Sequence, residues 1–347
     1  MRGRGLGLLL LCALAASGCN NASSGSRDPG KVVLPVKPVV VNGRLYATKG
    51  RTLYRFNGAR VATVLPGMKL KDPAVSLDGL TLAAANLEPQ SSTLTVSDAS
   101  GRDRRELTAA SAPEGTLWAF SPSISDDGRR ILFVTDRGKQ PSSPRNLQPN
   151  DFGVWLYDAS TAGSHRLTWP MPYTGGDADP VFRPGNNDQI VYTTYLYGGT
   201  PPQTVARLAW RSIQTGRTVY LSPDSGRSFQ PAFSPDGRFL AFIRAESGQD
   251  NLYVMPLAYV MPLAADIGHQ PQPPPSAAAV LLQSGIVAQP VWSPDGTAVA
   301  FLMLTKGNFD LYVLPVNTGQ AIRATGPAQA VTHGSFLDAD SRLAWSR

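Results

Sequence analysis

A short sequence that recurs along this chain constrains its fold more than any other feature. Each clear copy holds a Pro, an Asp five residues later and then a Gly, and the copies stand at 72–79 (DPAVSLDG), 121–128 (SPSISDDG), 230–237 (QPAFSPDG) and 289–296 (QPVWSPDG). A looser copy reads DPVFRPGNND at 179–188, and HGSFLDADSRLAW at 333–345 keeps neither the Pro nor the Asp-Gly pair. The anchor prolines are 49 to 59 residues apart, a period typical of propeller blades or other arrays.

The chemistry of one unit predicts a turn between two strands. In SPDG the Pro fixes φ, the Asp side chain caps the turn and the Gly accepts a positive φ. An alternating apolar strand follows at 238–243 (RFLAFI), and another extended run, 251–254 (NLYV), comes after a polar loop. With one further strand, each unit is predicted to be a four-stranded antiparallel meander. Because such a unit cannot bury both faces alone, we expect the units to pack in a ring.

Five internal units and one composite unit account for the chain. Residues 331–347 are too few for a whole blade, and 39–65 (with GRLYATKG, RTLYRFNG and ARVATVL) supplies the rest of a sixth. The prediction is an all-β fold over 39–347: a six-bladed β-propeller of four-stranded antiparallel blades, closed by shared N- and C-terminal strands. Two insertions, 139–152 and 259–278, lengthen loops of the second and fourth blades.

The pattern x-P-x-[WF]-S-P-D-G-x-x-[LIV]-A-F, followed by L-Y-V, resembles that of the TolB-like six-bladed propeller family. The pattern is clearest at 230–254 and 289–313, and the resemblance extends over 39–347. It concerns the propeller alone: the family's namesake carries an additional N-terminal α/β domain, and we expect none here, because only some twenty residues separate Cys19 from the first predicted strand. The resemblance implies a partner of the lipoprotein or peptidoglycan-associated kind, by analogy of fold.

The first residues predict export and lipidation. Arg2 and Arg4 precede a short apolar run at 6–14, and small residues then lead to Cys19. The apolar run is too short to span a membrane but suits a secretory signal, and the ending Ala-Ser-Gly-Cys resembles the bacterial lipoprotein box. The alternative is an ordinary signal peptide that is cleaved near Ala16 and leaves Cys19 unmodified.

The N-terminal features predict three segments. They are a lipoprotein signal peptide at 1–18, a tether at 19–38 that begins with the acylated Cys19, and the propeller. The other cysteine, Cys12, lies in the apolar run, so we expect no disulfide framework. The protein is expected in the bacterial cell envelope, lipid-anchored to a membrane and facing the periplasm or extracytoplasmic space.

The charge of the chain raises the question of nucleic-acid binding. The formal net charge is +7, and a basic balance is one footprint of such proteins. The Lys and Arg residues are nevertheless spread singly, with no basic run longer than a pair such as Arg104-Arg105. We therefore expect a solvated basic surface and no nucleic-acid partner.

The residue before each anchor Pro is expected to begin the innermost strand of its blade, where equivalent positions meet at the channel. Read across the six units, these residues are all polar: Asp72, Ser121, Asp179, Gln230, Gln289 and His333. One interpretation is a ring at the channel mouth that receives a ligand, a cation or a partner's loop. The alternative is a set of solvated strand starts around water. We do not expect Asp72 and Asp179 to chelate one metal, because they stand two blades apart and a hard cation needs several oxygens within about 2.6 Å.

The sequence predicts no catalytic residue, cofactor or metal site. The aspartates of the repeated turns are interpreted as turn formers. Each stands on a separate blade, which places them too far apart for general acid–base catalysis. They are Asp78, Asp127, Asp236 and Asp295. No G-x-S-x-G, H-E-x-x-H, phosphate-loop or Rossmann motif occurs. We expect a non-catalytic scaffold that engages another envelope protein or a cell-wall element at the channel mouth. The rival prediction is an envelope glycan or peptide hydrolase or lyase at the same mouth, and a third is a purely structural spacer.

Overall fold

The structure is a computed structural model of the chain. It describes residues 32–36, 39–108, 118–136, 152–170, 174–198, 203–222, 226–257, 279–319 and 321–347. The predicted signal peptide (1–18), Cys19, most of the tether and nearly all of both insertions lie outside these ranges.

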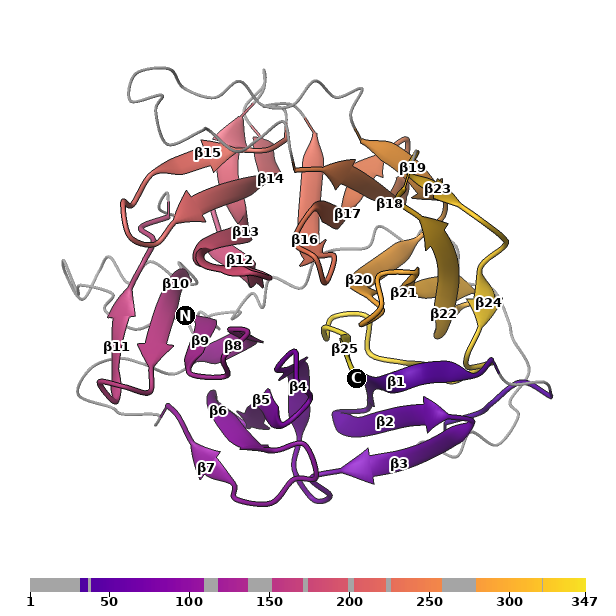
Figure 1. Ribbon diagram of the computed structural model, residues 1–347, viewed down its shortest axis with the longest axis horizontal. Helices are drawn as coiled ribbons and strands as arrows, with labels where there is room; N and C mark the ends of the chain where they lie inside the picture. The colour runs from indigo at the N-terminus through magenta and orange to yellow at the C-terminus, as the bar shows by residue number, and fades with distance from the viewer. Residues whose placement is uncertain are drawn as a thin grey trace, which may run out of the picture.

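Strands make up the regular structure of the described residues, and they are arranged in sheets around a common centre (Figure 1). No helix occurs in the described ranges. The predicted all-β propeller arrangement is therefore confirmed. The chain follows the ring in sequence order, so each unit packs against the units that precede and follow it (Figure 1).

Three of the sheets have four strands each. In the first, the C-terminal strand pairs with a three-stranded meander, and the other two are four-stranded meanders. The first comprises β25 (Ala344–Ser346), β1 (Val41–Lys49), β2 (Thr52–Gly58) and β3 (Arg60–Val64). The second comprises β4 (Leu70–Val75), β5 (Thr81–Glu88), β6 (Ser91–Asp98) and β7 (Arg105–Glu106). The third comprises β8 (Ala119–Ile124), β9 (Arg130–Thr135), β10 (Gly153–Asp158) and β11 (Gly163–Arg166).

The remaining strands form one sheet of eight strands and one of five. The larger comprises β12 (Asp177–Arg183), β13 (Asn186–Gly198), β14 (Gln203–Ser212), β15 (Thr218–Tyr220), β16 (Arg227–Phe233), β17 (Phe239–Glu246), β18 (Gln249–Pro256) and β19 (Val280–Gln283). The smaller comprises β20 (Val287–Trp292), β21 (Ala298–Thr305), β22 (Asn308–Asn317), β23 (Arg323–Ala324) and β24 (Gln329–Ala330). Hydrogen bonding thus separates four blade-like sheets and one larger sheet, where the sequence predicted six separate blades.

The repeated turn has the structure that its residues predict. In the copy after β16, Asp236 Oδ1 accepts hydrogen bonds from Ser234 Oγ at 2.6 Å and from the backbone N–H of Arg238 at 3.1 Å. Ser234 Oγ in turn accepts from the N–H of Phe239 at 2.9 Å. The same Ser–Asp contact recurs at Ser76–Asp78, Ser125–Asp127 and Ser293–Asp295. The aspartates therefore close turns, as expected from the sequence.

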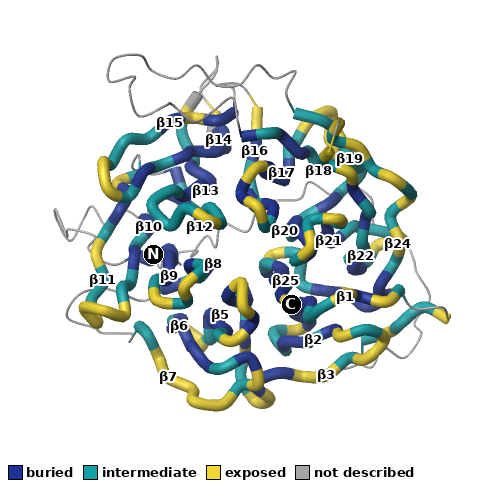
Figure 2. Tube along the Cα trace, viewed as in Figure 1, coloured by how far each residue is buried: buried dark blue, intermediate teal, exposed yellow. Residues whose placement is uncertain are grey.

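The hydrophobic core lies between neighbouring meanders. One cluster joins Ile243 of β17 to Trp292 of β20 and Phe301 of β21, and another joins Leu45 of β1 to Leu311 of β22. Exposed residues gather on outer strands such as β3 and β7 (Figure 2). Each meander thus buries its faces against its neighbours and leaves its outer edge to solvent, as expected of units that cannot fold alone.

At Gly237, the turn of one unit packs closely against the preceding unit. Gly237 has a φ of +67°, and an added Cβ would lie 2.4 Å from the carbonyl oxygen of Pro184. Gly248 has a φ of +76° with nothing within 4 Å of its Cβ position, which makes it a matched control. We expect Gly248→Ala to cost about 1 kcal/mol of unfolding free energy for the backbone strain, and Gly237→Ala to cost about 2 kcal/mol more for the clash. Urea unfolding of the two variants measures this difference, and equal costs would contradict it.

Candidate binding site at the propeller channel

The innermost strand of each internal unit breaks register at one place. The pairing of β4 with β5 stops at Lys71 and resumes at Ala74, and the same break occurs in β8, β12, β16 and β20. The residue at the break precedes the anchor Pro and has a left-handed φ between 49° and 56°, the five being Asp72, Ser121, Asp179, Gln230 and Gln289. A bulge of this kind interrupts the ladder and redirects a residue, and the left-handed backbone is strained for a residue other than Gly. Five of the six predicted site residues therefore share one structural position.

Strand register gives the sixth position to Arg342, so the prediction that His333 lies in this ring is wrong. Ala344 pairs with Tyr46 in the last unit in the way that Ala74 pairs with Ala83 in the first. Ala344 and Ala74 are therefore equivalent. Two residues before them stand Arg342 and Asp72, which are equivalent in turn. His333 is exposed, and its backbone N–H donates to the carbonyl oxygen of Val33 at 2.9 Å.

The error arose because the last copy of the repeat has no Pro, so its alignment was ambiguous. A signal was present in the sequence, since Trp345-Ser346 matches Trp292-Ser293. Aligning these pairs places Arg342 opposite Gln289.

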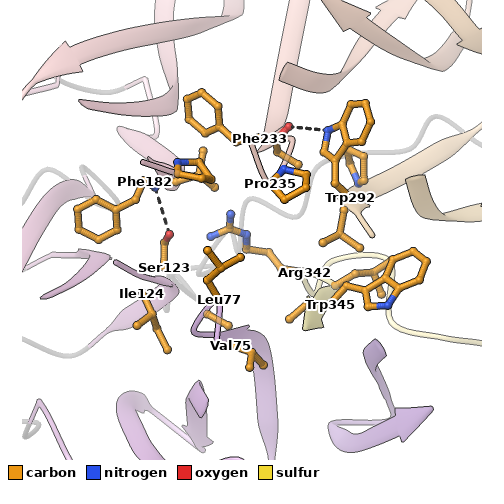
Figure 3. Close-up of a pocket in the computed structure, with 18 of the residues that line it drawn as sticks. Val75, Leu77, Ser123, Ile124, Phe182, Phe233, Pro235, Trp292, Arg342 and Trp345 are labelled. Atoms are coloured by element: carbon orange, nitrogen blue, oxygen red, sulfur yellow. Dashed lines mark hydrogen bonds between the residues drawn. The ribbon is translucent and has the colours of Figure 1, made fainter. Parts of the chain in front are cut away.

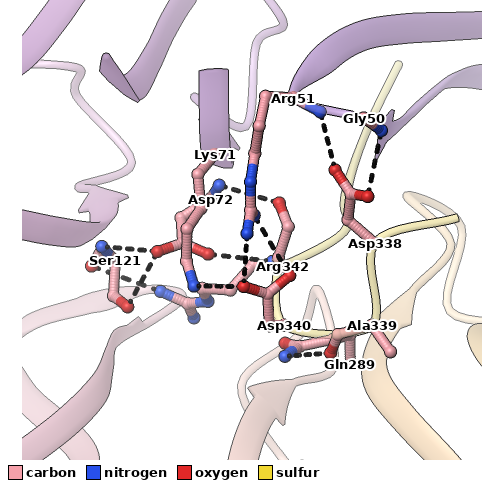
Figure 4. A network of polar contacts seen from close by, with 11 residues as sticks. Gly50, Arg51, Lys71, Asp72, Ser121, Gln289, Asp338, Ala339, Asp340 and Arg342 are labelled. Atoms are coloured by element: carbon pink, nitrogen blue, oxygen red, sulfur yellow. Dashed lines mark hydrogen bonds and ion pairs between the residues drawn. The ribbon is translucent and has the colours of Figure 1, made fainter. Parts of the chain in front are cut away.

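Hydrogen bonds join ring residues from different sheets (Figure 4). The Asp72 carboxylate accepts from the N–H and Oγ of Ser121 at 3.1 and 3.3 Å, and from the N–H of Arg342 at 3.1 Å. Gln230 Oε1 accepts from the N–H of Gln289 at 2.8 Å. Asp72 is almost fully buried, with 1% of its surface exposed. Its carboxylate therefore serves to join three sheets, because a buried carboxylate without such donors would be costly.

The guanidinium of Arg342 crosses the centre of the ring. Its Nη1 donates to the carbonyl oxygens of Ser121, Pro122 and Pro180 at 3.4, 3.2 and 3.2 Å. The side chain thus extends from the C-terminal segment to β8 and β12, and places a positive charge where strands from opposite sides of the ring meet. Burial raises the pKa of Asp179, although Arg342 opposes this and Asp72 adds to it.

A charged network lies at the face where the innermost strands begin (Figure 4). Asp340 accepts two hydrogen bonds from Arg51 at 3.1 and 2.9 Å and one from Lys71 Nζ at 3.2 Å. Asp338 accepts from the backbone N–H groups of Gly50 and Arg51 at 3.0 and 2.9 Å. Although burial acts in the opposite direction, Arg51 and Lys71 hold the pKa of Asp340 below its usual value of 3.8. These contacts attach the segment before β25 to the β1–β2 turn and to β4.

A pocket of about 180 Å³ opens at the other face, where the innermost strands end (Figure 3). Its walls include anchor prolines and aromatic side chains, namely Pro73, Pro122, Pro231, Pro290, Phe182, Phe233, Trp292 and Trp345. The second residue of each internal turn also lines it, and these are Leu77, Asp126, Pro184, Pro235 and Pro294. Of the ring residues, Gln230, Gln289 and Arg342 line the pocket. In the sequence the anchor prolines served only to align the repeats and the Pro of SPDG only indicated a turn, so the apolar wall was not predicted.

Two further observations concern the described residues as a whole. Within the described ranges, no group of three or more His, Cys, Asp or Glu side chains is placed to hold a metal ion. In the same ranges, no helix is long and apolar enough to cross a membrane.

Solved structures share this architecture, although no family model matches the chain. TolB from Acinetobacter baumannii is 17% identical, covers 88% of this chain and 67% of its own, and superposes with a TM-score of 0.62. A putative TolB from Agrobacterium tumefaciens is 16% identical over 75% of this chain and 86% of its own, with a TM-score of 0.52. Hydrazine synthase from Kuenenia stuttgartiensis is 10% identical over 86% of this chain and 47% of its own, with a TM-score of 0.59.

These comparisons establish the class of protein. At such low identities the likeness concerns the fold alone, and together with the ring of sheets it defines a β-propeller. More narrowly, the chain has the TolB-like propeller fold that the repeat pattern had indicated.

The Asp340 network should make part of the stability depend on pH. Because the folded-state pKa of Asp340 is depressed, its contribution is present above pH 3.8 and is lost as the pH falls through the folded-state pKa. We expect Asp340→Asn to lower the unfolding free energy at pH 7 by about 0.5–1 kcal/mol, since an ion pair this exposed is screened. Unfolding at several pH values should show the gap to the wild type closing below pH 3.8. Glu106→Gln, on the exposed β7, is the control and should show no such gap; a gap independent of pH would contradict this account.

Proposed function

We propose that the chain is a non-catalytic binding scaffold of the bacterial cell envelope. It engages another envelope protein or a cell-wall element at the mouth of the propeller channel. The observation that carries this proposal is the pocket at the end of the innermost strands, whose walls are built from prolines and aromatic side chains. Concave, mostly apolar sites with a few convergent polar groups are the usual form of binding sites, and here the ring residues Gln230, Gln289 and Arg342 supply the polar groups.

We further propose that 39–347 forms six blades closed by shared terminal strands. The eight-stranded sheet contains two meanders, β12–β15 and β16–β19, which the single parallel pair Ala206–Arg227 joins; this supports counting them as two blades. The antiparallel pairing of β25 with β1, from Arg44↔Ser346 to Tyr46↔Ala344, supports closure by the two ends. A closed ring has no open sheet edge at the junction and would hold the pocket walls rigidly.

The position of Val33 supports a lipid anchor on the side away from the pocket. Val33 donates to Ser335 Oγ at 2.9 Å, and Ser335 donates its backbone N–H to Asp310 near the start of β22. The start of β22 lies at the face where the innermost strands begin, which is opposite the pocket. A signal peptide at 1–18 and a lipid on Cys19, followed by the tether, would therefore leave the pocket facing away from the membrane. We propose this arrangement in the periplasm or extracytoplasmic space.

Site-specific photocrosslinking in intact cells tests the proposed function. A photoreactive phenylalanine analogue replaces Leu77, which lines the pocket and is 38% exposed. The matched control carries the analogue at Leu281, an exposed leucine of the outer strand β19. We expect a covalent adduct with an envelope protein or a cell-wall fragment from position 77 and none from position 281. Equal adducts from both positions, or none from position 77, would count against binding at the channel mouth.

The rival function, an envelope glycan or peptide hydrolase or lyase, has one observation in its favour. Asp179 and Asp72 both lie beside Ser121, and burial raises the pKa of Asp179, as a general acid requires. Two observations count against it. The Asp72 carboxylate is already occupied by hydrogen bonds from Ser121 and Arg342. His333 is not beside these carboxylates, and its backbone contacts Val33. Incubation with purified peptidoglycan should release no fragments, in wild type or in Asp179→Asn. Release by the wild type and not by Asp179→Asn would establish the enzyme instead.

A further inference from the structure

Arg342 has unused hydrogen-bonding capacity inside the pocket. Its Nη1 is held by three backbone carbonyl groups, whereas its Nε and Nη2 donate to no group in the described part of the chain. A guanidinium presents its donors in a planar fork that matches the two oxygens of a carboxylate. The three carbonyls fix the orientation of this fork before any ligand arrives, which reduces the ordering cost of binding.

The surroundings of Arg342 favour an anion at this point of the pocket. The charged side chains among the lining residues are Arg342 and Asp126, and Asp126 Oδ2 already accepts from the N–H of Gly185 at 2.6 Å. The ring carboxylates of Asp72 and Asp179 do not line the pocket, although Asp179 offsets part of the charge of Arg342. A group that enters from the open face therefore meets the positive charge of Arg342 among apolar walls, where charge-assisted hydrogen bonds are strengthened.

The side chains of the pocket walls indicate which ligand groups would bind beside the anion. Prolines and aromatic rings dominate the lining (Figure 3), and such surfaces suit apolar peptide side chains and extended backbones. Arg342 extends across the centre of the ring to β8 and β12, and Figure 3 shows its guanidinium among the side chains of the wall. A ligand is thus expected to place its charged group against the guanidinium and its apolar groups against the surrounding prolines and aromatic rings.

We propose that this pocket recognises a peptide of its partner through a carboxylate, with Arg342 as the anchor and apolar residues against the proline and aromatic wall. The carboxylate is that of a chain end or of an Asp or Glu side chain. This inference rests on the proposed binding function and specifies its chemistry. Arg342 is thereby a specificity-determining residue.

Two pools of random heptapeptides test the proposal. In the first, the peptides end in a free carboxylate and include Asp and Glu; in the second, they end in an amide and lack both residues. The full chain, solubilised in mild detergent, is immobilised and exposed to each pool, and bound peptides are sequenced. We expect enrichment of carboxylate peptides with apolar residues beside the carboxylate, and none from the neutral pool. Amidation of an enriched peptide then distinguishes a terminal carboxylate from a side-chain one.

Variants of Arg342 and Leu77 locate the interaction. Measured by fluorescence anisotropy, Arg342→Gln should weaken the binding of an enriched peptide about tenfold or more, as expected for loss of charge-assisted hydrogen bonds. Arg342→Gln also removes contacts between sheets. A second series of variants therefore changes Leu77, a pocket residue whose apolar side chain makes no polar contact within the protein. Relative to Leu77→Asn, Leu77→Asp should weaken binding and Leu77→Lys should strengthen it, each by about twofold to fivefold. Added salt should reduce both effects.

The outcomes separate this inference from the proposed function. If the neutral pool binds as well as the charged one and the Leu77 series has no effect, the carboxylate inference is overturned, but a peptide site at the pocket remains. If neither pool yields a binder and position 77 forms no photoadduct, both the inference and the proposed function fail.

Discussion

The left-handed residue before each anchor Pro is the constraint on which the channel depends. A residue before Pro normally prefers the extended region, so the conformation of Asp72 and its four equivalents has an energetic cost. The cost is offset where hydrogen bonds reach the same residue, as when the Asp72 carboxylate receives the N–H groups of Ser121 and Arg342. In four of the five units the Pro that follows the bulge also lines the pocket, and these are Pro73, Pro122, Pro231 and Pro290. One backbone feature, repeated around the centre, therefore builds both the polar ring and the pocket.

The two faces of the channel differ in chemistry because the innermost strands all run in the same direction. Where they begin, charged side chains from the chain ends meet, and Asp340 binds Arg51 and Lys71. Where they end, the Ser-x-Asp-Gly turns present Leu77, Asp126 and prolines. The first face joins the C-terminal segment to the early strands. The second carries few charges and offers a surface on which a partner can bury apolar groups.

Arg342 connects these two features of the molecule. Its backbone N–H belongs to the network around Asp72, while its guanidinium reaches the carbonyl groups of the second and third units and lines the pocket. A single residue thus contributes to the association of the C-terminal strand with the ring and to the electrostatic character of the site. Such a dual position explains why its substitution alone cannot separate folding from binding, and why a residue at the mouth such as Leu77 is needed beside it.

The sequence by itself determined the local structure and its repetition. Pro, Asp and Gly at fixed separations specify turns through φ preferences and side-chain caps that act within a few residues, so the turns, the strands and five of the ring positions could be read from 72–79 and its copies. The likeness to TolB-like propellers followed from the same residues.

The tertiary structure decided between the possible alignments of the last unit at the sixth position, and it alone showed what the pocket contains. The last unit has neither Pro nor Asp-Gly, and its innermost strand is defined by the pairing of β25 with β1, some 300 residues earlier in the chain. That pairing replaced His333 with Arg342. The apolar wall was likewise hidden, since a proline read in isolation indicates a turn, and only the ring brings those of several units to face one another. The physical reason is that local preferences act within a turn, whereas register and convergence are set by contacts between distant segments.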